Sequence, residues 1–263
     1  KNFSFCSAFV ENQARFSDYE TNYISRHGEF YPNASTVQQN GVVPGGGRTK
    51  PFKEGGVDYA YAVGSFLYTP IDNLEIRAGN APAFIGSGYR SLILSDHSYQ
   101  APSLDIKYSF LKKWSYGLRR TRLFNLIRKT TYSTVEAYYQ PKASALHFLT
   151  YQASPKITLE FFENSIWSMG DTVTTKPNGL YYVPLPFVGL SQSENFNIYG
   201  LNATEVLGKK VRLYQQFVLS GFSTENMGLQ LGLRIYDLIP NSMIQLEYNK
   251  VGAKIYASDI PNR

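Results

Sequence analysis

The sequence has few charged residues, a single cysteine and no long apolar run. Asp, Glu, Lys and Arg make up only 17% of the 263 residues, against about a quarter in an ordinary soluble protein. Cys6 stands alone, which excludes an internal disulfide framework. A membrane-spanning helix needs about 18 or more consecutive apolar residues, and the most apolar stretch, 181–190, is shorter and contains prolines. A disulfide scaffold and a helical membrane protein are therefore excluded.

Metal and hydrolase chemistry also find little support. His27, His97 and His147 are isolated, with no second cysteine at ligand spacing. Ser95, Asp96 and His97 are the residue types of a hydrolase triad, but triads assemble from residues distant in sequence. A polar turn is the better interpretation. We expect no enzyme, no metal and no cofactor.

The dominant pattern is alternation of apolar and polar residues with a period of two. One face of the segment 227–236 carries Met227, Leu229, Leu231, Leu233 and Ile235. The same alternation recurs in 74–79, 103–110, 156–161 and 244–249. Because side chains of a strand point alternately to opposite faces, each segment has one apolar and one polar side.

Two details favour an outer-membrane β-barrel over a soluble β-sandwich. Polar faces carry Gly, Gln, Asn and single charges, as a wet interior does, and apolar faces end in aromatics such as Tyr108, Trp114 and Tyr248. Further strands are expected near 3–10, 23–30, 57–68, 114–118, 133–139, 145–151, 196–207 and 211–219. The predicted fold class is all-β, a transmembrane antiparallel β-barrel of the bacterial outer membrane with at least about 12 strands.

One domain covering 1–263 is the simplest organisation, because no linker or repeat divides the chain. The segments 42–56 and 168–192 are expected to be long loops, and 207–210 a tight hairpin. The sequence begins and ends abruptly, which is compatible with a chain that is incomplete at both ends and with a signal peptide that lies outside this numbering.

A basic run from Lys112 to Lys129 interleaves aromatic residues, a pattern also found in nucleic-acid binding. In a membrane-embedded chain we expect no nucleic acid, and phosphates of lipopolysaccharide or an acidic glycan are the anionic partners. A solvated strand–turn–strand is the alternative. The Gly86-Ser87-Gly88 stretch lacks a βαβ unit around it, so backbone crowding is expected there instead of phosphate binding.

The stretch 84–96, which reads FIGSGYRSLILSD, resembles the Wzi-like capsule-assembly family, and in particular its Bacteroidota branch of RemB-like gliding-motility proteins. Two further patches are similar to this family, 162–167 with 180–187 and 199–202 with 213–219. The resemblance implies a non-enzymatic outer-membrane barrel. Such a barrel binds capsular or other surface polysaccharide, or serves as an accessory subunit of a gliding-motility or type IX secretion assembly with other outer-membrane proteins.

The predicted ligand or plug motif within this stretch consists of Gly86, Gly88, Tyr89, Arg90, Ser91, Ser95 and Asp96. Two interpretations of it stay open. Tyr89, Arg90 and Asp96 are exposed to a glycan, or Arg90 pairs with a carboxylate and the motif is a structural plug. A porin-like diffusion channel is the alternative function, since a polar interior suits it equally well.

Overall fold

The computed structural model describes residues 2–26, 29–30, 38–39, 42–43, 47–52, 56–96, 98–128, 139–168, 177–192 and 195–257. It is all-β, as predicted, with eleven antiparallel strands in one continuous sheet. Their order is β1-β6-β7-β8-β9-β10-β11-β12-β13-β14-β15. Apart from β1, neighbours in the sheet are neighbours in sequence, so the main sheet is a meander of hairpins.

The strands of this sheet are β1 (Asn2–Ala14), β6 (Gly56–Ile71), β7 (Leu74–Gly79), β8 (Ser103–Phe110), β9 (Trp114–Arg128), β10 (Tyr139–Ser154), β11 (Ile157–Ser168), β12 (Phe196–Leu207), β13 (Val211–Leu219), β14 (Met227–Tyr236) and β15 (Met243–Val251). The smaller elements are α1 (Asp18–Arg26), β2 (Glu29–Phe30), β3 (Gln38–Gln39), β4 (Val42–Val43), β5 (Gly47–Phe52) and the 3₁₀ turns η2 (Gly179–Tyr182), η3 (Val188–Ser191) and η4 (Thr224–Asn226). None of the helices in the described ranges is long and apolar enough to cross a membrane.

Three expectations about local structure need correction. The predicted strand at 23–30 begins instead with the end of the helix α1, which covers 23–26, while 29–30 form the short strand β2. The helix follows Ser17 and has acidic residues in its first turn, where the helix dipole favours them. The predicted loop at 42–56 contains β5, which pairs with the start of β6. The predicted strand at 133–139 lies outside the described residues, except for Tyr139.

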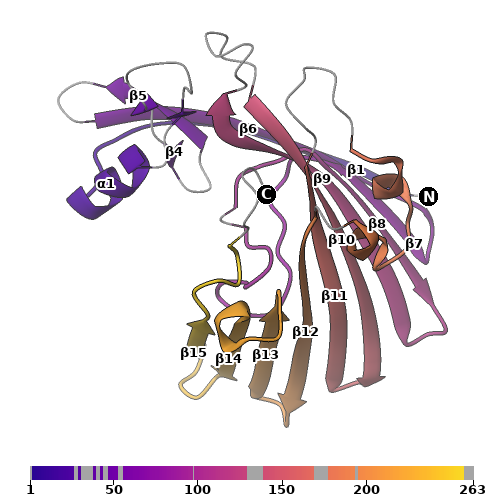
Figure 1. Cartoon of the computed structure of the whole chain (residues 1–263). Helices are drawn as coiled ribbons and strands as arrows, with labels where there is room; N and C mark the ends of the chain where they lie inside the picture. The colour runs from indigo at the N-terminus through magenta and orange to yellow at the C-terminus, as the bar shows by residue number, and fades with distance from the viewer. Residues whose placement is uncertain are drawn as a thin grey trace.

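The sheet curves, and the segment between β7 and β8 lies within the curve (Figure 1). We call residues 80–102 the inner segment and the side of the sheet that they cover the inner face. Within the described residues β1 and β15 form the two edges of the sheet. An antiparallel sheet is therefore established, and its closure into a barrel stays a prediction.

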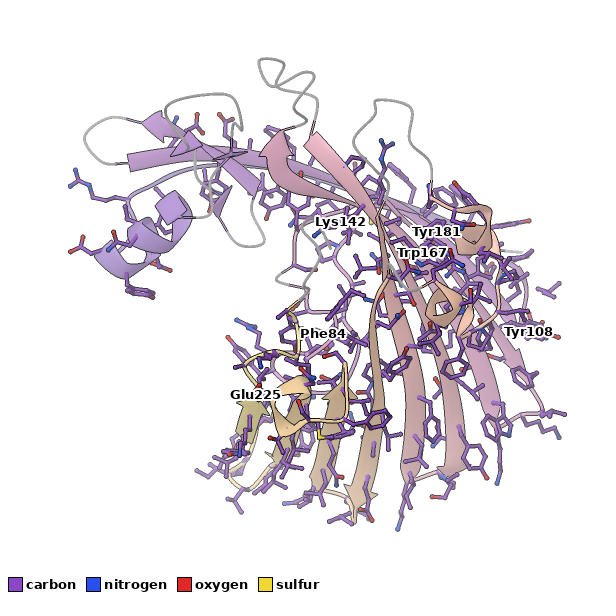
Figure 2. The ribbon with its side chains drawn as sticks, in the orientation of Figure 1. Phe84, Tyr108, Lys142, Trp167, Tyr181 and Glu225 are labelled. Carbon is purple, nitrogen blue, oxygen red and sulfur yellow. The ribbon has the colours of Figure 1, made fainter. Side chains whose placement is uncertain are left out.

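Register places the alternating residues on two distinct faces. On the inner face Arg77 lies opposite Asp105, which lies opposite Arg119. On the outer face the exposed large side chains are mostly apolar, namely Phe3, Phe5, Phe9, Phe66, Leu104, Tyr108, Phe161, Phe217, Leu231, Ile244, Leu246 and Tyr248. Figure 2 shows Tyr108 on this outer side and Phe84 within the curve. The predicted two-faced strands are thus confirmed.

Short turns connect the strands at one end of the sheet. The turn between β8 and β9 places Leu111 and Lys112 at φ 49° and 55°, the left-handed conformations that tight hairpins require. The inner segment and residues 177–192, which we call the outer segment, belong to connections at the opposite end. The outer segment packs on the outer face of β9–β12 through η2 and η3.

Two apolar clusters lie on opposite faces of this one sheet. The inner cluster consists of Leu92, Leu146, Phe162, Ile198, Val218 and Ile255. The outer cluster consists of Ala143, Ala145, Trp167 and Tyr181. Each cluster joins strands to a covering segment, so the sheet has a small core on either side.

Candidate functional site

The inner segment is held by polar side chains that project from β13, β14 and β15. The Gln216 Oε1 atom accepts a hydrogen bond from Leu92 N at 2.5 Å, and Gln230 Nε2 donates to Arg90 O at 2.7 Å. Glu247 Oε2 accepts from Tyr89 N at 2.7 Å. These side chains satisfy backbone groups that a loop on the face of a sheet would otherwise bury without a partner.

The two motif glycines allow the backbone to approach these side chains closely. A Cβ atom on Gly88 would lie 2.4 Å from Gln230 Oε1 and 2.6 Å from Arg90 O. Gly86 has φ +114°, a conformation that other residues rarely adopt. The predicted backbone crowding at these glycines is confirmed.

The motif serines and Asp96 shape the inner segment locally. Ser91 Oγ accepts hydrogen bonds from Ile93 N at 3.1 Å and Leu94 N at 3.2 Å. Ser95 Oγ donates to Asp96 Oδ1 at 3.1 Å, and Ser98 N donates to Ser95 O at 2.9 Å. The predicted polar turn is therefore present, while His97 lies outside the described residues.

The end of the described chain folds back onto the same place. Ile255 is fully buried in the inner cluster beside Leu92. Tyr256 donates from its hydroxyl to Leu92 O at 2.6 Å, and burial raises the pKa of Tyr256 above its ordinary value. The inner segment is thereby enclosed between the strands and the residues that follow β15.

Tyr89 and Asp96 are the exposed residues of the motif, and Arg90 is half-buried beside Tyr89. Tyr89 is 65% exposed, and the Arg90 guanidinium carbon lies 4.2 Å from the centre of its ring. Arg90 Nη1 donates to Tyr89 O at 3.2 Å, and among the described residues Arg90 forms no ion pair with a carboxylate. The predicted sign of a structural plug, an Arg90–carboxylate pair, is absent from this part of the chain. The backbone of the segment is nevertheless fixed firmly.

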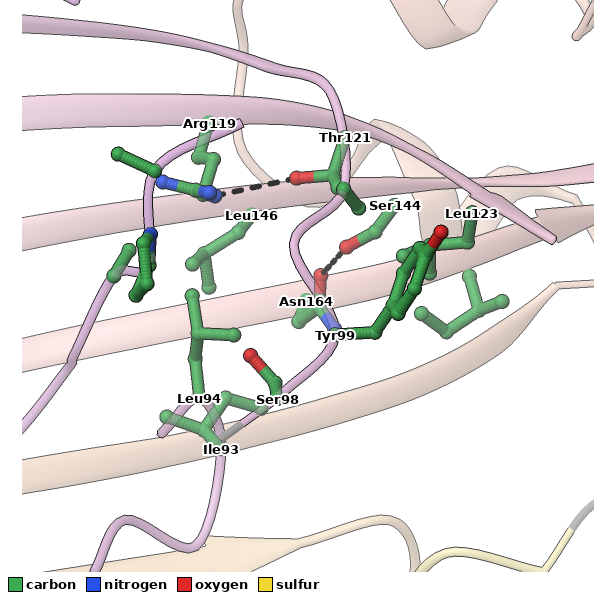
Figure 3. A pocket seen from close by; sticks show the side chains of 15 residues that line it. Ile93, Leu94, Ser98, Tyr99, Arg119, Thr121, Leu123, Ser144, Leu146 and Asn164 are labelled. Atoms are coloured by element: carbon green, nitrogen blue, oxygen red, sulfur yellow. Dashed lines mark hydrogen bonds between the residues drawn. The ribbon is translucent and has the colours of Figure 1, made fainter. Parts of the chain in front are cut away.

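Two cavities of moderate size flank the inner segment. One of about 220 Å³ lies between the segment and β9–β11, with Arg119, Ser144 and Asn164 among its lining residues (Figure 3). Arg119 donates to Thr121 Oγ1 in this cavity and pairs with Asp105 at 2.9 Å. The other, of about 210 Å³, is lined by Gly86 and Ser87 of the motif and by polar side chains of β11 and β12. Small, partly polar spaces therefore remain between the inner segment and the strands β9–β12.

The residues that hold the inner segment carry no distinctive motif. Gln230 and Glu247 occupy polar positions in regularly alternating segments, whereas Gln216 stands beside Gln215 in a segment without such alternation. Nothing in the sequence indicated that they meet the motif. Gln216 is 1% exposed and lies 124 residues from its partner Leu92.

The basic run between β8 and the end of β9 does not form one patch. Arg119 lies on the inner face in the ion pair with Asp105, and Arg120 lies on the outer face, where Nε donates to Tyr181 O and Nη2 to Val183 O, each at 2.8 Å. The side chains at 124–128 and residue 129 lie outside what the structure describes. The anion-binding interpretation of this run is not supported by its described part.

Polar residues also gather on the outer face, beneath the outer segment. Glu163 Oε2 accepts from Phe187 N at 2.7 Å, and Ser165 Oγ donates to Glu163 Oε1 at 3.0 Å. His147, opposite Glu163 in the register, hydrogen-bonds Tyr116. Ser165 is buried and bonded to a carboxylate instead of a histidine, so these residues do not form the nucleophile–base pair of a hydrolase.

Tyr181 anchors the outer segment. Its ring packs edge-on against Trp167 at 6.0 Å, and its hydroxyl donates to Ser144 O at 3.3 Å (Figure 2). Burial raises the pKa of Tyr181 to about 12. In the described ranges no cluster of three or more His, Cys, Asp or Glu side chains is placed to hold a metal ion.

Comparison with protein-family models, with curated proteins and with solved structures finds no match for this chain. The resemblance of 84–96 to the Wzi-like family therefore stays a prediction.

Proposed function

We propose that this chain forms a non-enzymatic β-barrel of the bacterial outer membrane that binds surface polysaccharide through the inner segment. Support for the membrane location comes from the outer face, where large apolar side chains are exposed along most strands of the sheet. A soluble protein rarely leaves so extended an apolar surface in water. The inner face instead carries Gln, Asn, Glu and Arg side chains, the arrangement expected when lipid lies outside and water inside.

The observation that carries the polysaccharide role is the exposed Tyr89 ring, with the half-buried Arg90 guanidinium against it, on a segment with a fixed backbone. An aromatic ring stacks on the apolar face of a sugar, and a guanidinium donates hydrogen bonds to hydroxyl or carboxylate oxygens. The Tyr89 amide is held by Glu247 and the Arg90 carbonyl by Gln230. Binding would therefore order little additional backbone, which favours affinity.

A Wzi-like role in capsule attachment agrees with this arrangement and with the sequence resemblance. The accessory role in a gliding-motility or type IX secretion assembly shares the same barrel and differs in its partners. The porin-like alternative is less favoured, because the inner segment covers the inner face of β11–β15 where a channel would need open space. An inner face covered in this way suits attachment better than diffusion.

The test removes the pair while leaving its support intact. Tyr89→Ala with Arg90→Ala should abolish retention of cell-surface polysaccharide at unchanged abundance of the barrel in the outer membrane. Tyr99→Ala is the matched control, since Tyr99 is an exposed tyrosine of the same inner segment, and it should retain polysaccharide. Full retention by the double variant would overturn the proposed site. Stable conductance of the purified protein in a planar bilayer would favour the porin.

A further inference from the structure

The outer segment is oriented opposite to an ordinary loop. Toward the sheet it presents backbone groups, which accept hydrogen bonds from Arg120 and donate to Glu163. Tyr116 also donates from its hydroxyl to Pro184 O at 3.0 Å. Away from the sheet it exposes large apolar side chains, namely Leu180, Tyr182, Leu185, Phe187 and Leu190.

This orientation lets the outer segment cover polar side chains that lie on the mostly apolar outer face of the strands. Arg120, His147 and Glu163 occupy positions of the outer face, where apolar residues such as Leu118, Leu149 and Phe161 precede or follow them along the strands. A charged side chain facing hydrocarbon costs several kcal/mol unless it is paired or covered. The outer segment covers these residues, gives Arg120 and Glu163 backbone partners and replaces their polar surface with its own apolar side chains, while His147 hydrogen-bonds Tyr116.

An apolar notch lies where the outer segment meets the exposed apolar face. It has a volume of about 150 Å³, and its walls include Leu149 and Phe161 of the strands and Pro186 and Phe187 of the outer segment. An engineered apolar cavity of about this volume holds a molecule as large as benzene. The polar groups at its margin are engaged, Glu163 with Phe187 N and Tyr116 with Pro184 O. The notch therefore suits a slender hydrocarbon group.

We propose that the notch and the exposed apolar side chains of the outer segment bind hydrocarbon chains of membrane lipid. This inference rests on the membrane location proposed above. Continuity identifies the occupant, because Phe161 and Leu149 belong both to the notch and to the row that continues through Leu201 and Phe217 across the outer face. A lipid chain lying along that row would contact apolar side chains both on the row and in the notch. The outer segment thus extends the lipid-contacting surface beyond the strands.

Depth measurements in vesicles test the outer segment directly. In the full chain carrying Cys6→Ser, single cysteines are introduced by Leu185→Cys in the outer segment, Leu231→Cys on the outer face and Lys209→Cys in the turn between β12 and β13. Each is labelled with a small fluorophore, and the protein is inserted into vesicles of brominated phosphatidylcholine. Bromine on the acyl chains should quench the labels at positions 185 and 231 several-fold more than the label at position 209.

The outcomes separate this inference from the proposed location. Quenching at 231 without quenching at 185 would overturn lipid binding by the outer segment and leave the membrane barrel standing. Absence of quenching at both positions would overturn the membrane location itself. Labels at 185 that are quenched in vesicles but shielded by a second protein in native outer membranes would assign the outer segment to a protein partner, which also overturns the inference.

Occupancy of the notch is tested by filling it. Leu149→Trp places a large aromatic ring in the notch, whereas Leu201→Trp adds the same ring to the same row two strands away. Lipid retained through purification in mild detergent, counted by native mass spectrometry, should fall several-fold in the first variant and stay unchanged in the second. Equal retention by the two variants would exclude the notch as the binding site.

Discussion

The inner and outer segments cover opposite faces of the same sheet and differ in which side chains they bury and which they expose. The inner segment buries Leu92 against the strands, and its exposed side chains include Tyr89, Asp96 and Tyr99. The outer segment satisfies charged side chains of the strands with its backbone and exposes Leu185 and other large apolar groups. Each segment thus shows the surface that the proposed membrane location requires, polar toward water on one side and apolar toward hydrocarbon on the other.

The backbone of each segment needs specific hydrogen-bond partners on the sheet. A loop laid on a sheet must find partners for its own backbone groups, because the strands use theirs in the ladder. On the inner face these partners are the side chains of Gln216, Gln230 and Glu247. On the outer face they are Arg120 and Glu163. Side chains of the sheet therefore recognise the covering segments through main-chain atoms.

The largest expected effect concerns the outer anchor. Tyr181 is 7% exposed against Trp167, whereas its neighbour Tyr182 is 62% exposed. Tyr181→Ala should lower the free energy of unfolding by about 3–5 kcal/mol, the usual cost of removing a buried aromatic ring. Tyr182→Ala should change it by no more than about 0.5 kcal/mol. Guanidinium unfolding in detergent micelles measures both, and equal effects would show that the outer segment is not packed as described.

The next effect compares the two faces of the strands. Leu231→Arg on the outer face should destabilise the protein in lipid by about 2–4 kcal/mol, because the charge would face hydrocarbon. Ser4→Arg adds the same charge at an exposed position of the inner face, where about 0.5 kcal/mol or less is expected. The measurement is unfolding of protein inserted in vesicles. Tolerance of Leu231→Arg in lipid would contradict a lipid-facing outer surface.

A smaller effect tests the inner anchor with two adjacent glutamines. Gln216 is 1% exposed on the inner face and bonds Leu92 N and Asn202 Oδ1, while Gln215 is exposed on the outer face. Gln216→Ala leaves buried groups without partners and should cost about 1–3 kcal/mol. It should also speed proteolysis within 80–102. Gln215→Ala should leave unfolding and proteolysis unchanged, and a pair of variants that behave alike would refute the anchoring role.

Much of the fold could be predicted from residue order because strands have a period of two. The segment 227–236 alternates Leu and Ile with Gly, Gln and Arg, and the structure forms β14 there. The motif 84–96 stood out by its glycines, its tyrosine and arginine and its resemblance to the Wzi-like family. Local signals failed where another segment decides the outcome. Nothing in the sequence near Arg120 and Glu163 indicates that the outer segment supplies backbone partners for both.

By itself the sequence determined that the strands are two-faced, which residues share a face and where tight turns occur, because those properties depend on residues next to one another. The tertiary structure alone decided that the inner segment meets β13–β15 and that the outer segment covers Arg120 and Glu163. These contacts join residues far apart in the chain, such as Leu92 and Gln216. These contacts depend on the strand order and the curvature of the whole sheet, and no local sequence pattern indicates either.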